Sequence, residues 1–274
     1  MKNFPSLNGF NQLCDGRHGT FLINKNDTFV GKSLQTYGEW SEEEVTLFNA
    51  LCRPGDFVLE AGSNIGSHTI PIAKMIGPNG RLFAFEPQRI VFQTLNANVA
   101  LNSLTNVHVH HLAIGAEPGK VIIPEINYES SNNFGGIRAH SHDKGETVAC
   151  VTLDQFMNLP KLRLLKADIE DMEVDLVKGG INLIKKLKPI LYIESEPSKD
   201  FSQELLSILL PIYPDIYWHV PRMFNPDNFK QEQDNIFSNY ASFNILCLPE
   251  GCDAKIDIEK FKLKKIITPT DKPF

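Results

Sequence analysis

The sequence predicts an α/β fold with a doubly wound, mostly parallel sheet of the Rossmann-like type. Three observations lead to this prediction. A short apolar strand at 57–61 passes through a glycine-containing turn into a helix-patterned segment at 68–75. Strand-like and helix-like segments then alternate as far as residue 112, and the loops between them are short. Short connections between alternating strands and helices imply right-handed parallel crossovers.

The composition fits one large domain with appendages. The chain has 274 residues, of which 42% are hydrophobic and 22% are charged. We expect residues 37–274 to form the main domain and residues 1–36 to form a small N-terminal β extension or cap. The net charge of −6 provides no general positive field for polyphosphate, so nucleic acid is not an expected partner.

Cysteine usage and hydropathy favour a cytoplasmic location. The five cysteines are scattered, and their spacing matches neither a disulfide framework nor a zinc site. The N-terminal residues lack the apolar core of a signal peptide, and no apolar run reaches membrane-spanning length. Nothing in the sequence selects an oligomeric state.

A helix is expected at 41–51, before the first strand of the sheet. Ser41 is suited to the N-cap and Glu44 to the capping-box position. The acids of this first turn also complement the positive end of the helix. Glu39 and Trp40 precede the cap, so they are free to face a site.

The turn after the first strand has the residues of a nucleotide-binding loop. Glu60 lies at the end of the strand, and Gly62 allows a sharp turn with positive φ. Asn64 tolerates the left-handed region, and Gly66 allows the helix or a ligand to approach the backbone closely. Gly-x-x-x-Gly turns are common, so the turn alone does not establish a binding site.

A second acid strengthens the nucleotide-binding interpretation. Glu86 ends the predicted strand at 81–87 and lies 20 positions after Gly66. A carboxylate at this place can accept hydrogen bonds from both hydroxyls of an adenosine ribose. Ala113 and Ile114 follow a third strand, and we expect them to flank a bound base because ligands bind outside the carboxyl ends of such strands.

A fourth strand, at 162–170, ends in two acids. Asp168 and Glu170 point to the same side of an extended chain, toward the mouth of the predicted site. Three interpretations stay open for them: a general base with its partner, a pair of divalent-metal ligands, or a solvated helix start. A fifth strand at 189–197 and two closing strands follow.

Two long polar segments, 125–147 and 221–240, separate the predicted strands. Loops of this length inside a compact domain are usually functional. We expect both to face the substrate, the first as a lid. His140 and His142 lie in the first segment and are either surface histidines or reserve candidates for a catalytic base.

Taken together, these motifs resemble the FkbM-type methyltransferases that depend on S-adenosyl-L-methionine. The matching pieces follow the family order across about residues 37–250, and the N-terminal 36 residues lie outside the resemblance. The pieces are Tyr37-Gly38-Glu39-Trp40-Ser41-Glu42, Arg53-Pro54-Gly55-Asp56, Glu60 to Thr69, Phe85-Glu86-Pro87, Asn96 to Asn102, Leu153-Asp154, and Leu165 to Glu170 running on to Lys178-Gly179-Gly180.

The resemblance implies a class I methyltransferase sheet of seven strands, with the last strand antiparallel. It implies S-adenosyl-L-methionine as the cofactor and places Asp168 and Glu170 beside the site of methyl transfer. Two residues depart from the family pattern: Asp171 replaces a usual glycine, and Glu60 replaces a usual aspartate. The residues expected to contact the cofactor are Glu39, Glu60, Gly62, Ser63, Asn64, Gly66, Ser67, Glu86, Pro87, Ala113, Ile114 and Asp168.

These expectations point to O-methylation of a hydroxyl on a sugar, a glycan or another small metabolite. The methyl group of a sulfonium is already activated, whereas a hydroxyl needs a base or a metal to lose its proton. We expect Asp168 to be the base or a metal ligand and Glu170 to be its partner. Mg²⁺ is a further candidate cofactor.

Two other classes of protein remain open. A nicotinamide-dependent oxidoreductase would also use a glycine turn and a ribose acid, but the turn at 62–66 lacks the Gly-x-Gly-x-x-Gly spacing. A non-catalytic binding module could keep the cofactor fold and recognise a partner only. Intact Asp168 and Glu170 favour the enzyme, and Asp171 mildly favours the module.

Overall fold

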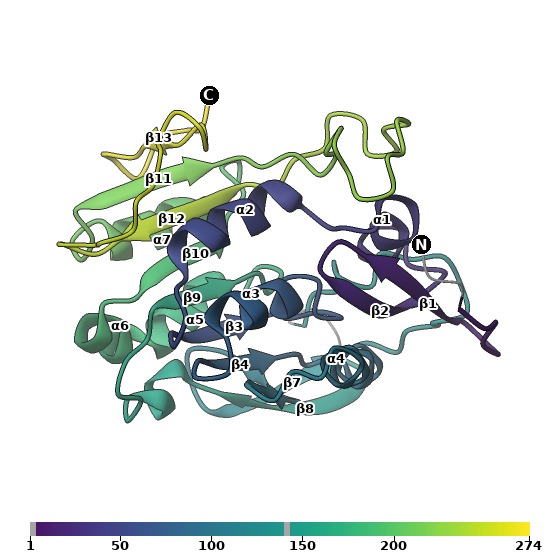
Figure 1. The fold of residues 1–274 in the computed structure, drawn as a ribbon. Coiled ribbons are helices and arrows are strands. Elements are labelled where there is room, and N and C mark those ends of the chain that lie inside the picture. The colour runs from purple at the N-terminus through teal and green to yellow at the C-terminus, as the bar shows by residue number, and fades with distance from the viewer. Residues whose placement is uncertain (1–3, 140–142) are drawn as a thin grey trace.

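The computed structural model describes residues 4–139 and 143–274, which fold around one large sheet (Figure 1). The sheet has eight strands in the order β13-β11-β12-β10-β9-β3-β4-β5. In chain order these strands are β3 (Phe57–Ala61), β4 (Arg81–Phe85), β5 (Val107–His110), β9 (Leu164–Ala167), β10 (Ile190–Glu194), β11 (Asp215–His219), β12 (Asn244–Leu248) and β13 (Lys264–Lys265).

Strand directions in this sheet agree with the prediction. Strands β5, β4, β3, β9 and β10 pair in parallel. Strand β12 lies between β10 and β11 and is antiparallel to both. The mostly parallel sheet with an antiparallel last main strand is therefore confirmed. The two-residue strand β13, antiparallel to β11, is an addition that the sequence did not predict.

The chain order reverses beside β3, and this reversal creates the site. Strand β4, the next in the chain, lies on one side of β3, and β9 lies on the other. Loops that leave neighbouring strands in opposite directions open a crevice at the carboxyl ends of the strands, which is where ligands of open α/β sheets bind.

Helices cover both faces of the sheet. On one face α2, α3 and α4 pack against Val58 and Leu82, and on the other α5, α6 and α7 pack against Leu59 and Leu165. Side chains along β3 thus alternate between two buried layers, as the period of a strand requires. The helices are α2 (Glu42–Leu51), α3 (Thr69–Ile76), α4 (Arg89–Leu101), α5 (Glu173–Gly179), α6 (Ile181–Leu187), α7 (Asp200–Leu209) and the 3₁₀ turn η1 (Leu153–Phe156).

An N-terminal hairpin of β1 (Asn11–Gly16) and β2 (Gly19–Asn24) packs on α4. The Asn98 side chain accepts a hydrogen bond from the Leu22 N–H at 2.6 Å and donates one to the Leu22 carbonyl at 3.0 Å. Asn102 contacts the N–H and carbonyl of Thr20 in the same way, at 3.2 and 2.8 Å. The hairpin is therefore attached to α4 through its backbone as well as through apolar side chains such as Phe21, which shares a core cluster with Val91.

A helix follows this hairpin that the sequence did not predict. Helix α1 (Val30–Tyr37) runs across the expected boundary at residue 36. The division into residues 1–36 and 37–274 remains a prediction.

The third sheet of the structure is a small one beside the main sheet. It has the order β6-β8-β7, with β6 (Ala113–Ile114), β7 (Gly119–Ile123) and β8 (Glu146–Val151). Strands β7 and β8 are antiparallel and bracket the polar segment at 124–145. None of the helices in the described ranges is long and apolar enough to cross a membrane.

The predicted capping box at the start of α2 is wrong. Ser41 precedes the helix with φ of 45°, in the left-handed region, and its side chain makes no capping hydrogen bond. Glu44 is buried and lines a cavity instead of capping the helix.

Candidate active site

A cavity of about 450 Å³ opens at the carboxyl ends of β3, β4, β9 and β10. The turn after β3 and the two long polar segments contribute to its lining. Of the residues predicted to contact the cofactor, the cavity or a smaller pocket beside it is lined by Glu60, Gly62, Ser63, Asn64, Ser67, Glu86, Pro87, Ala113, Ile114 and Asp168.

Gly62 contacts the ends of three strands, because it follows β3 and lies against the ends of β4 and β9. Its φ is 76°, and a Cβ on this residue would lie 1.8 Å from the carbonyl oxygen of Asp168. The N–H groups of Gly62 and Ser63 both donate to the carbonyl of Phe85, each at 3.0 Å. Asn64, with φ of 49°, adopts the left-handed conformation that its residue type allows.

The Glu86 carboxylate is held in a fixed orientation at the end of β4. It accepts hydrogen bonds from the N–H of Asn64 at 2.9 Å and the N–H of Gln88 at 2.8 Å. Each oxygen keeps a lone pair for a further donor. Glu86 is only 4% exposed, and this burial raises its pKa to about 7.

A small apolar pocket of about 50 Å³ adjoins the main cavity next to Glu86. Ala113 and Ile114 line it together with Phe85 and Met172. These side chains come from the ends of β4 and β6 and from the start of α5, which suits the pocket to a flat apolar group.

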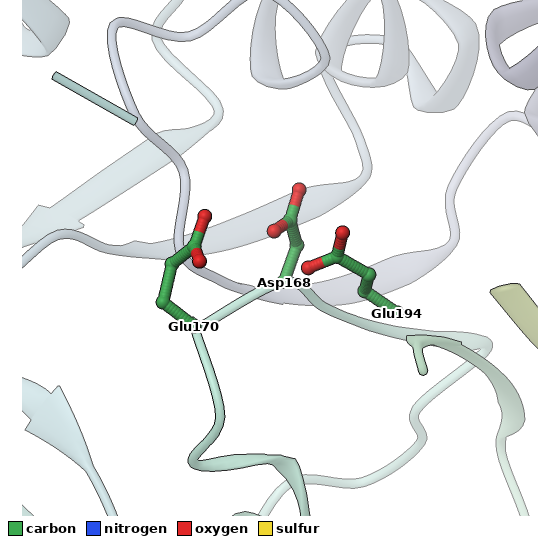
Figure 2. Close-up of side chains that lie close together, drawn as sticks. All are labelled: Asp168, Glu170 and Glu194. Carbon is green, nitrogen blue, oxygen red and sulfur yellow. The ribbon is translucent and has the colours of Figure 1, made fainter. Parts of the chain in front are cut away.

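Three carboxylates that line the main cavity lie close together (Figure 2). One carboxylate oxygen from each of Asp168, Glu170 and Glu194 lies within 4.8 Å of the other two. Glu194 ends β10, and parallel pairing of β9 with β10 brings it beside Asp168. The sequence shows Glu194 as a strand-end acid, which is the same signal that identified Asp168, but it does not show that the two strands are neighbours.

A left-handed turn, not an extended chain, brings Glu170 to this cluster. Strand β9 ends at Ala167, and Glu170 and Asp171 have φ of 54° and 74°. The predicted alternation along an extended strand is therefore wrong, although Asp168 and Glu170 do lie together. Asp171 occupies a left-handed position that glycine adopts most readily, and it is held by Lys199 at 2.6 Å and Arg138 at 2.8 Å.

Lys166 places a buried positive charge beneath the carboxylates. Its Nζ lies 3.5 Å from Asp168 Oδ2 and 4.0 Å from Glu60 Oε1. Burial alone would lower the pKa of Lys166, but the surrounding carboxylates, Asp168 first, outweigh that effect and raise it. Burial and then the charge of Asp168 raise the pKa of Glu170 to about 8, and they raise the pKa of Glu194 well above its usual range.

A second buried pair, which the sequence did not indicate, lines the cavity near α2. His68 Nε2 lies 3.6 Å from Glu44 Oε2, and both residues are about 5% exposed. Burial lowers the pKa of His68 well below 6.5 and raises the pKa of Glu44 to about 7. At neutral pH His68 is therefore neutral, and Glu44 is about half protonated.

Glu39 and Gly66 are the two predicted cofactor contacts that the structure does not place on the cavity or pocket. The carboxylate of Glu39 accepts hydrogen bonds from Arg17 Nε at 2.6 Å, Asn225 Nδ2 at 2.7 Å and the Phe229 N–H at 2.9 Å. It thus joins the N-terminal hairpin to the segment at 221–240. Gly66 packs against Leu95 of α4.

Both polar segments reach the cavity. Asn133, Gly135 and Gly136 line it from the first segment, and a Cβ on Gly135 would lie 2.7 Å from Asn64 Nδ2. Met223 and Tyr240 line it from the second segment. His140 and His142 lie outside the described residues.

Comparison with known proteins agrees with this arrangement. The family model for the methyltransferase FkbM domain matches residues 60–219, which is more than half of the chain. The chain belongs to the FkbM methyltransferase family. The match runs from Glu60 at the end of β3 to the last residue of β11, so it includes the turn, Glu86 and the three carboxylates.

Individual relatives of this FkbM chain are distant. Methyltransferase 1 of Beauveria bassiana is 24% identical over 144 residues, which are 45% of this chain and 57% of that protein. The catalytic subunit of a tRNA (adenine(58)-N(1))-methyltransferase of Cryptococcus neoformans is 37% identical over 59 residues, 22% of this chain and 14% of that one. The chain thus spans little more than half of the first curated relative.

A solved methyltransferase FkbM from Methylobacillus flagellatus KT is similar at a TM-score of 0.48 and 17% identity. The similarity covers 73% of this chain and 47% of that chain.

Proposed function

We propose that this chain transfers a methyl group from S-adenosyl-L-methionine to a hydroxyl of a small acceptor, such as a sugar, a glycan or a related metabolite. One observation carries the proposal. A single cavity connects the fixed carboxylate of Glu86 and its apolar side pocket with Asp168. The buried ammonium group of Lys166 lies beside Asp168.

The residues present fit the proposed cofactor. Glu86 has lone pairs left for the ribose hydroxyls, and the pocket at Ala113 and Ile114 is apolar, as a purine requires. Glu60 Oε1 lines the same cavity and is buried without a hydrogen-bond donor among the described residues. Lys166 Nζ lies 4.0 Å from this oxygen, beyond hydrogen-bond distance, so the oxygen can still accept a hydrogen bond from an ammonium group of the ligand.

The chain itself has to position the acceptor and accept one proton. The bound cofactor would supply a methyl group that is already activated. Asp168 is our proposed base, because its carboxylate lies in the cavity and forms an ion pair with the buried Lys166 ammonium at 3.5 Å. The pKa of Glu170 is raised to about 8 and that of Glu194 is raised as well, so their protonated forms can donate hydrogen bonds to Asp168 or to the acceptor.

The outer wall of the cavity supports an uncharged hydroxylated acceptor. Aromatic side chains from distant segments meet there: Phe29 and Tyr240 have ring centroids 5.4 Å apart, and Trp40 and Phe243 also line the wall. Flat apolar faces beside carboxylates suit a ring that carries hydroxyls. Among the described lining residues Lys166 is the only lysine or arginine, so a phosphate-bearing acceptor or nucleic acid would lack a partner.

Calorimetric titration with S-adenosylhomocysteine tests the cofactor assignment. We expect binding that Glu86→Ala weakens strongly, and no binding of NAD. Binding of NAD alone would support the oxidoreductase instead. Once binding is established, hydroxylated saccharides and metabolites can be screened as acceptors. Turnover of none of them by a protein that binds the cofactor would favour the non-catalytic module.

The second candidate function is methyl transfer that depends on Mg²⁺. The three clustered carboxylates provide the oxygen ligands that this cation prefers. Lys166 already supplies positive charge at this place, which favours the metal-independent form. Activity that EDTA abolishes and Mg²⁺ restores would establish the metal-dependent form.

We also propose a cytoplasmic location and a single methyltransferase domain over residues 37–274. All five cysteines are free, which fits a reducing compartment. The hairpin before this domain would act as a cap.

A further inference from the structure

Gln88 carries a buried hydrogen-bond acceptor that has no donor. The residue is 5% exposed and precedes α4, two positions after Glu86. Its Oε1 is buried and makes no hydrogen bond within the described part of the chain. An unpaired buried carbonyl oxygen is costly, so a partner is expected when the site is filled.

The orientation of this side-chain amide is determined by its other end. Gln88 Nε2 donates a hydrogen bond to the main-chain carbonyl of Phe134 at 2.8 Å. A carbonyl oxygen can only accept, so the NH₂ group has to face Phe134. The opposite atom, Oε1, is thus an acceptor and cannot exchange roles with the NH₂ group without losing the bond to Phe134.

Gln88 lies where the main cavity and the apolar side pocket join, and it lines both. Its main-chain N–H donates to Glu86, the residue proposed to hold the ribose. The side pocket beyond it is lined mainly by apolar residues such as Ala113 and Ile114, together with the acids Glu86, Asp168 and Glu170. Of the side-chain acceptors around this pocket, Gln88 Oε1 is the uncharged one that lacks a partner among the described residues.

We propose that Gln88 selects the base of the cofactor by accepting a hydrogen bond from the 6-amino group of adenine. This inference rests on the proposed function. A 6-amino group donates, whereas a 6-oxo group presents an acceptor and leaves two oxygens facing each other. A site that is built to bond an N–H rejects an analogue lacking it, because the buried partner stays unpaired.

Calorimetry with two matched ligands tests the proposal without an acceptor or turnover. S-adenosylhomocysteine and S-inosylhomocysteine differ in the group at purine position 6. We expect the unsubstituted protein to bind the adenosyl compound at least tenfold more tightly. In Gln88→Met, which keeps the size of the side chain but removes the acceptor, the two affinities should come within about threefold of each other.

Two more variants separate base selection from other effects. Gln88→Glu keeps an acceptor oxygen but loses the donor to Phe134, so we expect it to bind more weakly and still prefer the adenosyl compound. Gln93→Met makes the parallel substitution at an exposed position of α4 and should leave both affinities unchanged. Thermal unfolding without ligand checks that each variant is folded.

The possible outcomes are distinguishable. If the folded protein binds S-adenosylhomocysteine but also binds S-inosylhomocysteine equally well, Gln88 does not select the base and the proposed function stands. If the folded protein binds neither compound, the proposed function and this inference are both overturned.

Discussion

Asp168 is the residue on which the proposed chemistry depends. We expect Asp168→Asn to lower kcat about 10²- to 10⁴-fold, because the amide cannot take the proton of the acceptor hydroxyl. Affinity for S-adenosylhomocysteine, measured by calorimetry, should change by no more than a few-fold. Asp200→Asn, the same substitution at an exposed position in α7, is the control. Full turnover in Asp168→Asn would assign the base elsewhere.

At the scale of residues, prediction from sequence worked where a role depends on neighbours in the chain. The turn at Gly62 and Asn64 has the positive φ values that were expected, because those conformations follow from residue type. Glu194 and Lys166 were missed because their places in the cluster depend on the pairing of β10 and β9 with other strands. Glu39 was expected at the cofactor, yet its partners come from about 20 residues before it and 190 after it in the chain.

The turn after β3 is the element whose geometry the site needs most. We expect Gly62→Ala to reduce the free energy of unfolding by roughly 3 kcal/mol or more, because a Cβ would overlap the Asp168 carbonyl in addition to the cost of positive φ. Gly55→Ala is a matched control: its φ is also positive, at 88°, but no atom lies within 4 Å of the added Cβ. Urea denaturation of both variants measures the difference, and equal losses would show that packing against Asp168 does not matter.

The segment at 221–240 is the second element with a testable attachment. Glu39→Ala removes the acceptor for Arg17, Asn225 and the Phe229 N–H. We expect faster hydrogen exchange and faster proteolysis within 221–240, with the affinity for S-adenosylhomocysteine nearly unchanged. The control is Glu250→Ala in the exposed loop after β12. A large loss of cofactor affinity with no change in exchange would restore the cofactor contact first expected of Glu39.

At the scale of elements, the strands and helices from 57 to 112 could be predicted because hydrophobic period and turn residues agree there. The strands β6 and β13 have two residues each, which is too short to show a hydrophobic period. They are strands only because they pair with β8 and β11. The capping box failed for a related reason. Ser41 and Glu44 match the motif locally, but the tertiary structure buries Glu44 in the cavity wall.

For the whole molecule, buried acids should make stability depend on pH. The pKa of Glu170 is raised to about 8, and those of Glu44, Glu86 and Glu173 to about 7. Each of these groups binds a proton more tightly when folded than when unfolded, so each lowers the free energy of unfolding as pH rises from its unfolded pKa to its folded one. His68 and His219 have lowered pKa values and act in the opposite direction, but only below about pH 6.5.

We therefore expect the free energy of unfolding to fall between pH 6.5 and 8.5. Glu170→Gln should make the decline shallower by at most about 1.4 kcal/mol per pH unit, the value for one proton. Urea denaturation at a series of pH values measures both slopes. A flat profile in this interval would mean that the acids are not held protonated in the folded state.

The overall architecture could be predicted more completely than the site. Alternating strands and helices with short loops leave few possible topologies, and the parallel sheet follows from them. The cavity combines the ends of four strands, two distant polar segments and the start of α1, which precedes the family match. Which of these segments meet is decided by long-range packing, which neither residue type nor spacing reports.

The attachment of the N-terminal hairpin has a consequence for solubility. Strand β2 would leave a free edge, and an unpaired row of N–H and carbonyl groups is a template on which another polypeptide can add a strand. Asn98 of α4 and Asn102, the residue that follows the helix, bond alternate backbone units of β2 through both their oxygen and their nitrogen. Two amide side chains thus imitate a neighbouring strand, and a helix closes an edge that could otherwise seed aggregation.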